Sequence, residues 1–299
     1  MKKNIKVLIT ATALTIIGTI LFLIGGVMSG FDITALSSEK ESEATYNITE
    51  SFGNINIDTS TANVKLVVST DGVCRVECKE TERIFHKVSV SNGTLNIILK
   101  DTRAWYEHIG LFYVNLSITV YLPEGEYGKL NIETDTGKIN VESGFTFESA
   151  KIESDTGKIT CGANVKGNTF IETNTGSVSV SDATLASIKV SVDTGSVTIS
   201  GVSADGIDIE SDTGGVRLEN TILTGRLDIE TDTGNVNVWD CDAAEIKIET
   251  DTGNVKGHFL TEKTFFAHSD TGKVVVPNTI GGGRCEITTD TGNIRFDFD

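Results

Sequence analysis

The sequence predicts an all-β fold: a single-stranded parallel β-helix (β-solenoid) with about 19–20 residues per coil, preceded by an N-terminal transmembrane helix. Three observations support this prediction. A tripeptide recurs nine times at a nearly constant spacing, and apolar residues alternate with polar ones on both sides of each copy. A long uncharged apolar run lies near the N-terminus.

The apolar run covers residues 7–28, and its 22 residues are enough to cross a bilayer core of roughly 30 Å. Lys2, Lys3 and Lys6 precede the run, and no acidic residue appears before Asp32. This asymmetry predicts a single-pass anchor over residues 1–30, with the C-terminal part outside the cell membrane. Residues 27–29 also fit a cleavage site, so a cleaved signal peptide is the alternative. Both interpretations export the rest of the chain.

Three further segments are expected after the anchor. Residues 31–45 are polar and predict a linker. Residues 46–128 alternate apolar and polar side chains between turn residues, as in "KVSVSNGTLNIIL", and predict an N-terminal β region that caps the solenoid. Residues 129–299 predict the regular solenoid of nine coils.

The repeat is the tripeptide Asp-Thr-Gly, with Asn once in place of Asp, and its copies are 19 or 20 residues apart. A period of this length indicates coils that cannot bury their apolar face alone and must stack. At about 4.8 Å per coil, nine coils predict a rod of about 43 Å. The copies begin at Asp135, Asp155, Asn174, Asp193, Asp212, Asp232, Asp251, Asp270 and Asp290.

Apolar residues recur three and five positions before each copy, and four and six positions after its first residue. Because they are two residues apart, they predict two strands per coil with one face inward. The threonine just before the aspartate has the same parity, and an inward threonine excludes an ice-binding surface. Cysteines in these columns are expected to be small buried hydrophobes; they are Cys161, Cys241 and Cys285. A column ten residues before the copy is expected at a corner: Phe145, Val202, Ile222, Cys241, Leu260 and Ile280.

Asp-Thr-Gly is also the tripeptide that carries the catalytic aspartate of aspartic proteases. Those enzymes need two carboxylates that share a proton in an apolar site, whereas these copies follow one another one coil apart. We therefore interpret the tripeptide as a turn. The aspartate is expected to bond the backbone two residues on, and the glycine to supply a positive φ.

The outward face is expected to carry two acidic ladders, one formed by the aspartates and one by glutamates two residues earlier. Neighbouring lysines can offset part of their repulsion, and weak Ca²⁺ binding along the ladders is an open alternative to a solvated face. The glutamates are Glu133, Glu153, Glu172, Glu210, Glu230 and Glu249. The lysines are Lys138, Lys151, Lys158, Lys189, Lys247 and Lys273.

Composition and motifs argue against an enzyme and against a nucleic-acid partner. The chain has 42 acidic and 25 basic residues, and a field of that sign repels nucleic acid. It contains no C-x-x-C pair, and its four histidines share no motif. We assign no catalytic, cofactor-binding or metal-binding residues and no cofactor, because no nucleophile–base or metal constellation is visible.

The chain resembles the bacterial "putative adhesin" family of domains of unknown function, whose members are found on envelope proteins. The matching stretches are "GGVMSGFDITALSSEK", "FGNINIDTSTANVKLVVS", "SNGTLNII" and "ITVYLPEGEYGKLNIETDTGKINV", followed by the later turns. Family members more often have Ser-Ser-Gly at the turn. The resemblance implies a right-handed solenoid on the cell surface, and it implies no catalytic residues.

The leading functional hypothesis is a non-enzymatic, membrane-anchored surface protein that presents a repetitive face to the cell wall or to a protein ligand. The alternative is an envelope stress or signalling accessory that contacts a neighbouring membrane protein. A carbohydrate-active β-helix enzyme ranks third, because the outward columns are monotonous and aromatic residues make up only 7% of the chain.

Overall fold

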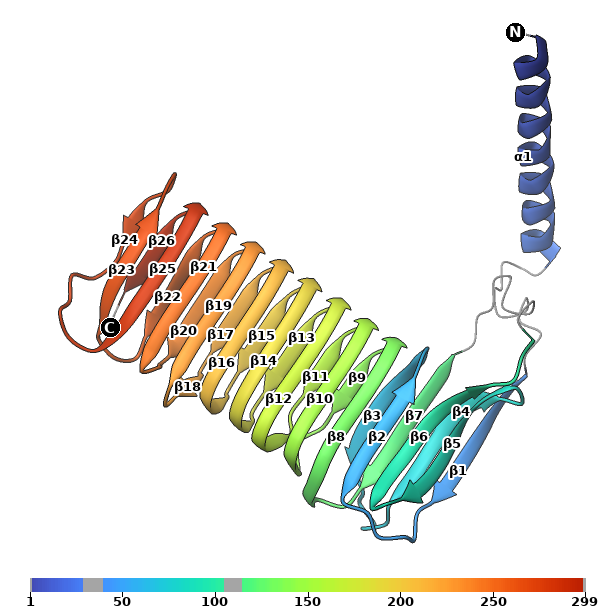
Figure 1. Ribbon diagram of the computed structural model, residues 1–299, viewed down its shortest axis with the longest axis horizontal. Coiled ribbons are helices and arrows are strands. Elements are labelled where there is room, and N and C mark those ends of the chain that lie inside the picture. Colours follow the sequence, from blue (N-terminus) through green and yellow to red (C-terminus); the bar gives the residue numbers. More distant parts are fainter. Residues whose placement is uncertain (1, 29–39, 105–114, 298–299) are drawn as a thin grey trace.

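A computed structural model describes residues 2–28, 40–104 and 115–297. It contains one helix, α1 (Lys2–Met28), and a rod built from two facing β-sheets (Figure 1). Each coil of the rod contributes one strand to each sheet, and equivalent strands of successive coils pair in parallel. The predicted all-β parallel solenoid of about nine turns is confirmed.

We call the two sheets A and B. In sheet A the strands follow the spatial order β1 (Glu41–Asn47), β4 (Arg75–Thr81), β7 (Leu116–Leu122), β3 (Ala62–Val68), β9 (Ile139–Val141), β11 (Ile159–Cys161), β13 (Val178–Ser181), β15 (Val197–Ser200), β17 (Val216–Glu219), β20 (Val236–Cys241), β22 (Val255–Phe259), β26 (Ile294–Asp297) and β24 (Val274–Val275).

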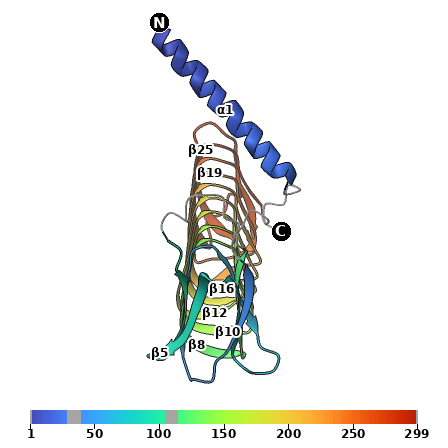
Figure 2. The same ribbon diagram turned by 90° about the vertical axis from the view of Figure 1, so that its right-hand side faces the viewer.

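In sheet B the order from the same end is β5 (Ile84–Ser91), β6 (Thr94–Asp101), β2 (Asn54–Thr59), β8 (Gly125–Thr136), β10 (Phe145–Thr156), β12 (Asn164–Thr175), β14 (Thr184–Thr194), β16 (Ser203–Thr213), β19 (Arg226–Thr233), β21 (Glu245–Thr252), β25 (Gly283–Thr291) and β23 (Lys263–Ser269), with β18 (Ile222–Leu223) beside β16. Seen along the rod, these strands lie one behind another (Figure 2).

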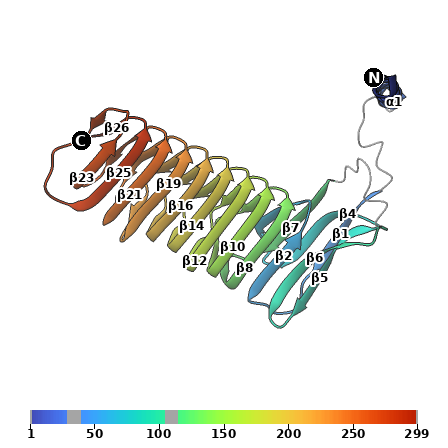
Figure 3. The ribbon, with the colours of Figure 1, turned by 45° about the horizontal axis from the view of Figure 1, so that its top comes forward.

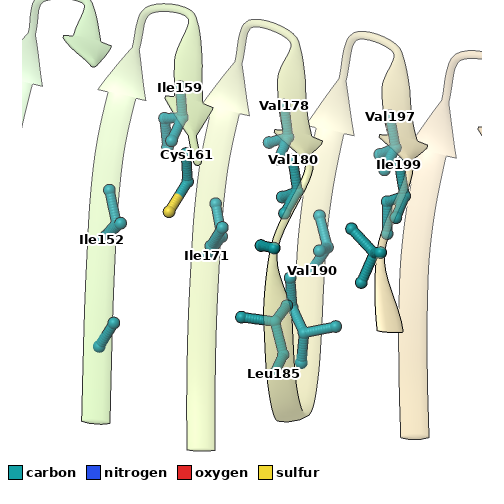
Figure 4. Packing of buried hydrophobic residues seen from close by; sticks show 14 of the residues in the cluster. Ile152, Ile159, Cys161, Ile171, Val178, Val180, Leu185, Val190, Val197 and Ile199 are labelled. Atoms are coloured by element: carbon teal, nitrogen blue, oxygen red, sulfur yellow. The ribbon is translucent and has the colours of Figure 1, made fainter. Parts of the chain in front are cut away.

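The core lies between the sheets and consists of aliphatic rows (Figure 4). Ile152 pairs with Ile171 in one sheet, and Ile159 pairs with Val178 in the other, so like residues stack on like. The predicted inward columns are buried throughout except in the coil of β23 and β24, where Val274 is 39% exposed. The predicted buried cysteines are confirmed, and burial raises the pKa of Cys161 to about 11.

The predicted corner column is correct only in part. Phe145, Val202 and Cys241 are buried, whereas Ile222, Leu260 and Ile280 are exposed. The buried residue follows a residue of positive φ: Val202 follows Gly201, and Thr221 follows Asn220. The residue of positive φ turns its successor inward, so the corner lies wherever that residue falls: nine residues after the first residue of the tripeptide at Val202, and ten at Phe145. A fixed count from either tripeptide therefore misplaces the corner in some coils.

The second corner, at the repeated tripeptide, shows why glycine is needed there. Asp and Thr still belong to the strand, and the chain turns at Gly and the residue after it. A Cβ atom on Gly195 would lie 1.6 Å from the carbonyl oxygen of Gly176 in the preceding coil. The same clash recurs at all nine glycines, with gaps of 1.6–2.1 Å. Only three of them have a positive φ, namely Gly176, Gly195 and Gly214, so close stacking rather than φ explains most of them.

Hydroxyl groups tie these corners together from inside. The residue before the aspartate is inward, as predicted, and in several coils its hydroxyl donates to the glycine carbonyl of the adjacent coil. The hydroxyls of Ser211 and Thr231 have no hydrogen-bond partner in the described structure, and Val192 has no hydroxyl. The oxygen–oxygen distances are 3.2 Å from Ser154 to Gly137 and 3.3 Å from Thr173 to Gly157. The expected hydrogen bonds, in which each aspartate would accept from the backbone N–H two residues on, are absent among the described residues.

Both ends of the rod depart from sequential stacking. The last coil of the described chain, β25 and β26, is inserted between the coil of β21 and β22 and the coil of β23 and β24 (Figure 3). At the other end, β2 and β3 lie between β6 and β7 on one side and β8 and β9 on the other. The coils therefore do not stack in chain order at either end of the rod.

Side-chain size explains the insertion at the C-terminal end. Gly257 faces Phe296 across the pair of β22 and β26, and a Cβ atom on Gly257 would lie 3.0 Å from the Phe296 ring. Phe296 stacks on Phe259 with ring centroids 4.9 Å apart and lies 5.7 Å from Phe265. Sequential order would instead put Val276 beside Gly257 and leave this space unfilled.

The N-terminal region differs from the predicted division of the chain. β1 begins at Glu41, inside the range assigned to a linker, and residues 31–39 of that range lie outside the described residues. The range 46–128 includes a coil in register with the rod, because Ile55 pairs with Leu130. Antiparallel pairs of β1 with β4 and β5 with β6 close this end. β5 and β6 form a hairpin, whereas β1 pairs with β4 across the intervening β2 and β3.

α1 occupies the range predicted to span the membrane. In the part of the chain that the structure describes, no helix combines the length and the apolar character needed to cross a membrane.

The glycine corners lead to a direct test. Gly214→Ala places a Cβ atom 1.7 Å from the Gly195 carbonyl oxygen, whereas Gly215→Ala meets its first neighbour at 3.4 Å. We expect Gly214→Ala to lower the free energy of unfolding by about 1–3 kcal/mol and Gly215→Ala to change it by less than about 0.5 kcal/mol. Chemical denaturation measures both, and equal stability of the two variants would contradict the stacking argument.

The inserted coil predicts an unusual order of hydrogen-exchange protection. Strands flanked on both sides exchange more slowly than edge strands. We expect the amides of Ile294–Asp297 to be better protected than those of Val274–Val275, although the former lie nearer the end of the chain. Mass spectrometry of deuterated peptides measures this order, and the reverse order would support sequential stacking.

Candidate functional site: a lysine-rimmed hollow

The outer face of sheet B carries the predicted acidic ladder, and three of its six glutamates are paired with lysines. Lys151 lies 2.7 Å from Glu153, Lys189 lies 2.5 Å from Glu210, and Lys247 lies 2.9 Å from Glu249. Hydrogen bonds to these carboxylates raise the pKa of each lysine. The prediction that lysines offset the ladder is confirmed at these three positions, so this face is a lattice of alternating charge.

The aspartate column lies exposed along one edge of the rod. Stacked carboxylates have neighbours only above and below, at about 4.8 Å, so a third lies roughly twice as far away. Within the described ranges, the ladders bring no three carboxylates within ligand distance of one another. The arrangement offers neither a preformed Ca²⁺ cage nor the paired, buried aspartates of a protease.

A different surface lies on the outer face of sheet A, near the N-terminal end of the rod. There β4, β7, β3, β9 and β11 border a hollow of about 590 Å³. Its floor is formed by small polar side chains that point outward. They are Asn63, Ser117, Thr119, Asn140 and Thr160.

Four lysines surround this floor: Lys65, Lys79, Lys138 and Lys158. Lys65 lies on β3 beside Thr119 and Asn140, and Lys79 lies on β4 beside Ser117. Lys138 and Lys158 occupy equivalent corner positions in adjacent coils, just before β9 and β11. We call this surface the lysine-rimmed hollow.

Carboxylates are missing from the described lining of the lysine-rimmed hollow, although the chain has 42 of them. None of the four lysines forms an ion pair with a described residue, in contrast to Lys151, Lys189 and Lys247. A second hollow of similar volume on sheet B shows the difference, because Asp208 and Asp228 line it. The lining of the lysine-rimmed hollow therefore carries positive charge only, while Glu43, opposite Lys79, and Glu77, opposite Thr119, lie at its border.

This arrangement is suited to bind an anion. Lysine ammonium groups are mobile point charges that bind phosphate, and hydroxyl and amide groups on the floor can hydrogen-bond its oxygens. The hollow extends over five adjacent strands, which is about 20 Å at the usual spacing. A linear ligand with several charges could therefore contact the rim lysines together.

The sequence indicated only part of this site. Lys138 and Lys158 were expected to offset the acidic ladder, and the structure places them instead at the rim of the hollow. Lys65 and Lys79 lie outside the regular repeat, and the threading of β3 between β7 and β9 brings Lys65 beside the repeat corners. One feature of the sequence could have indicated this site: in two successive coils a lysine follows the glycine of the tripeptide, at Lys138 and Lys158.

The fold and this surface define a class of protein: a long parallel β-solenoid with glycine corners and no ligand-enclosing domain among its described residues. Residues 52–297 match the Toastrack DUF4097 family, so the chain belongs to this family. The resemblance to a family of adhesin-like domains of unknown function is confirmed. Among curated proteins, none matches the chain.

Solved structures share the fold at low sequence identity. A "putative lipid binding protein" from Parabacteroides distasonis is 14% identical, with a TM-score of 0.50, and the match covers 86% of this chain and 97% of that one. A "putative adhesin" from Bacteroides fragilis is 13% identical, with a TM-score of 0.45 and coverage of 87% and 98%. At 14% identity, the likeness to the first of these structures shows the fold alone.

Proposed function

We propose that this chain is a non-enzymatic, adhesin-like protein of the cell envelope that binds a phosphate-bearing polymer in the lysine-rimmed hollow. One observation carries the proposal: four lysines meet around a polar floor that lacks carboxylates, on a chain of net charge −17. Overall repulsion would otherwise keep polyanions away, so the local concentration of positive charge selects the binding surface.

The polar floor favours a polymer over the acyl part of a lipid. The aliphatic residues at the base of the hollow, such as Val64 and Ile118, direct their side chains into the core and are fully buried. An acyl chain would find no apolar wall there, whereas phosphate and hydroxyl groups would find donors. A lipid headgroup shares the phosphate chemistry, and the experiment below distinguishes the two sources.

Envelope attachment is the second part of the proposal, with α1 as the anchor. Large apolar side chains on successive turns of α1 are about half exposed or more, including Leu14, Ile17, Leu21 and Ile24. Exposed apolar side chains on a helix are stabilised when something covers them, and a membrane would supply that cover for an exported chain. Cleavage of this segment is the competing outcome.

The absence of catalytic activity is part of the same proposal. The repeated aspartates are exposed and equivalent along the rod, so none has the desolvated, asymmetric environment that acid–base catalysis requires. A flat, repetitive, rigid surface is well suited to binding an extended ligand.

Binding of poly(glycerol phosphate) to the immobilised full chain tests the ligand. We expect salt-sensitive binding that Lys138→Gln/Lys158→Gln weakens about tenfold, a loss of about 1.4 kcal/mol. The matched control, Lys151→Gln/Lys247→Gln, removes the same charge from sheet B and should bind like the wild type. No binding, or equal losses in both variants, would contradict the proposal.

Vesicles of phosphatidylglycerol form a second arm of this experiment. Polymer binding that depends on Lys138 and Lys158 supports the proposal. Vesicle binding that needs these lysines, without polymer binding, would replace the polymer by a lipid headgroup.

Cell fractionation followed by mass spectrometry of the N-terminus tests the anchor. We expect the chain in the membrane fraction with α1 intact, because an uncleaved apolar segment holds it there. A mature N-terminus after residue 28 would show that the segment is a signal peptide.

A further inference from the structure

The cap of the rod contains a buried polar cluster. On β4, the alternation that buries Val76 also turns Cys78 and Glu80 inward, and on β5 His86 points into the same space. Their exposed fractions are 2%, 7% and 1%. These positions would be expected to hold apolar residues, because a buried carboxylate without a partner is costly.

The three side chains converge on one point. The Cys78 sulfur, a Glu80 carboxylate oxygen and a His86 ring nitrogen all lie within 4.8 Å of one another. His86 Nδ1 is 3.6 Å from Glu80 Oε2. The ligands of a tetrahedral zinc ion lie roughly 3.3–3.8 Å apart, given bonds of about 2.0–2.3 Å. One pair already has this separation, and the others need to close by about 1 Å or less.

His86 Nδ1 has no hydrogen-bond partner in the described structure although it is fully buried. The other ring nitrogen, Nε2, is 3.1 Å from the hydroxyl of Thr59. If Nε2 donates to Thr59, the lone pair of Nδ1 points at Glu80. A histidine that binds a metal usually donates its other ring N–H to a second group, and this hydrogen bond fixes the tautomer.

Glu80 lacks a cation to balance it. One carboxylate oxygen accepts a hydrogen bond from the His86 backbone N–H, at 2.9 Å. Within the described residues, Glu80 forms an ion pair with no lysine or arginine. The basic side chain beside it is His86. Burial raises the pKa of this carboxyl group, and hydrogen bonds with the His86 backbone and the Tyr46 side chain offset part of that rise.

We propose that Cys78, Glu80 and His86 bind a single Zn²⁺ ion. A thiolate and a carboxylate supply two negative charges, and a neutral imidazole supplies none, so the divalent ion leaves a buried site without net charge. Mixed sulfur, nitrogen and oxygen ligands suit zinc better than calcium or magnesium. Three protein ligands leave the fourth position for a water molecule.

The protonation states of the free side chains are compatible with this role. Burial lowers the pKa of His86 to about 4, so the imidazole is neutral and able to coordinate. Burial raises the pKa of Cys78 to about 12, and a zinc ion would displace its proton on binding. The ion would join β4 to β5 across the cap, where each sheet has an edge strand.

Cobalt titration of the full chain, kept reduced and freed of metal by chelation, tests the site. We expect one Co²⁺ per chain, a thiolate-to-cobalt charge-transfer band, and displacement by Zn²⁺. Cys78→Ala should lose the band, and Cys74→Ala should keep it, because Cys74 lies outside the cluster. Absence of the band in the wild type, or its survival in Cys78→Ala, would overturn the proposal.

A second measurement does not depend on the variants folding. X-ray absorption of the zinc-loaded wild type should show one sulfur and an imidazole nitrogen in the coordination shell. A shell of oxygen and nitrogen alone would mean surface binding and would overturn the assignment. Glu80→Gln should weaken binding and keep the band, because the sulfur remains.

Discussion

The close stacking of glycine corners is the constraint on which the rest of this structure depends. At each repeat the carbonyl oxygen of one coil occupies the space that a Cβ atom of the next coil would need. This contact fixes the spacing and the register of the coils together. Once the corners are aligned, every inward column falls on the same column of the neighbouring coil, and a one-residue slip would turn each aliphatic row outward.

The ends of the rod are held by the same glycine contacts and, in addition, by the fit of large side chains. The last described coil fits between two earlier coils because its glycine corner, Gly292, meets the corner of Gly253. Its Phe296 fills the space above Gly257. An asparagine ladder follows the same path, with Asn293 donating to Asn254 and Asn254 donating to Asn235. Because this coil is inserted, the last described strands have a neighbour on each side and do not form the edge of a sheet.

The two faces of the rod separate charge, and this separation gives the molecule its functional asymmetry. On sheet B, lysines and carboxylates alternate closely and neutralise one another, as with Lys189 and Glu210. On sheet A near the cap, lysines surround hydroxyl and amide groups, and Glu43 and Glu77 lie at the border of this surface. Beneath the same region, the core changes from aliphatic to polar around His86. The N-terminal end is thus where an otherwise uniform solenoid becomes chemically distinct.

The sequence by itself determined the solenoid, its period, its two inward faces and the buried role of Cys161, because these features repeat locally and strand alternation is a short-range rule. It also determined that threonines such as Thr173 point inward. Only the tertiary structure decided the order of coils at each end, since Gly257 and Phe296 meet through a contact that no period encodes. The tertiary structure likewise brought Lys65 to Lys138 and Cys78 to His86. These groups come from segments that pair out of chain order or in antiparallel, and the spacing of residues along a strand carries no information about such partners.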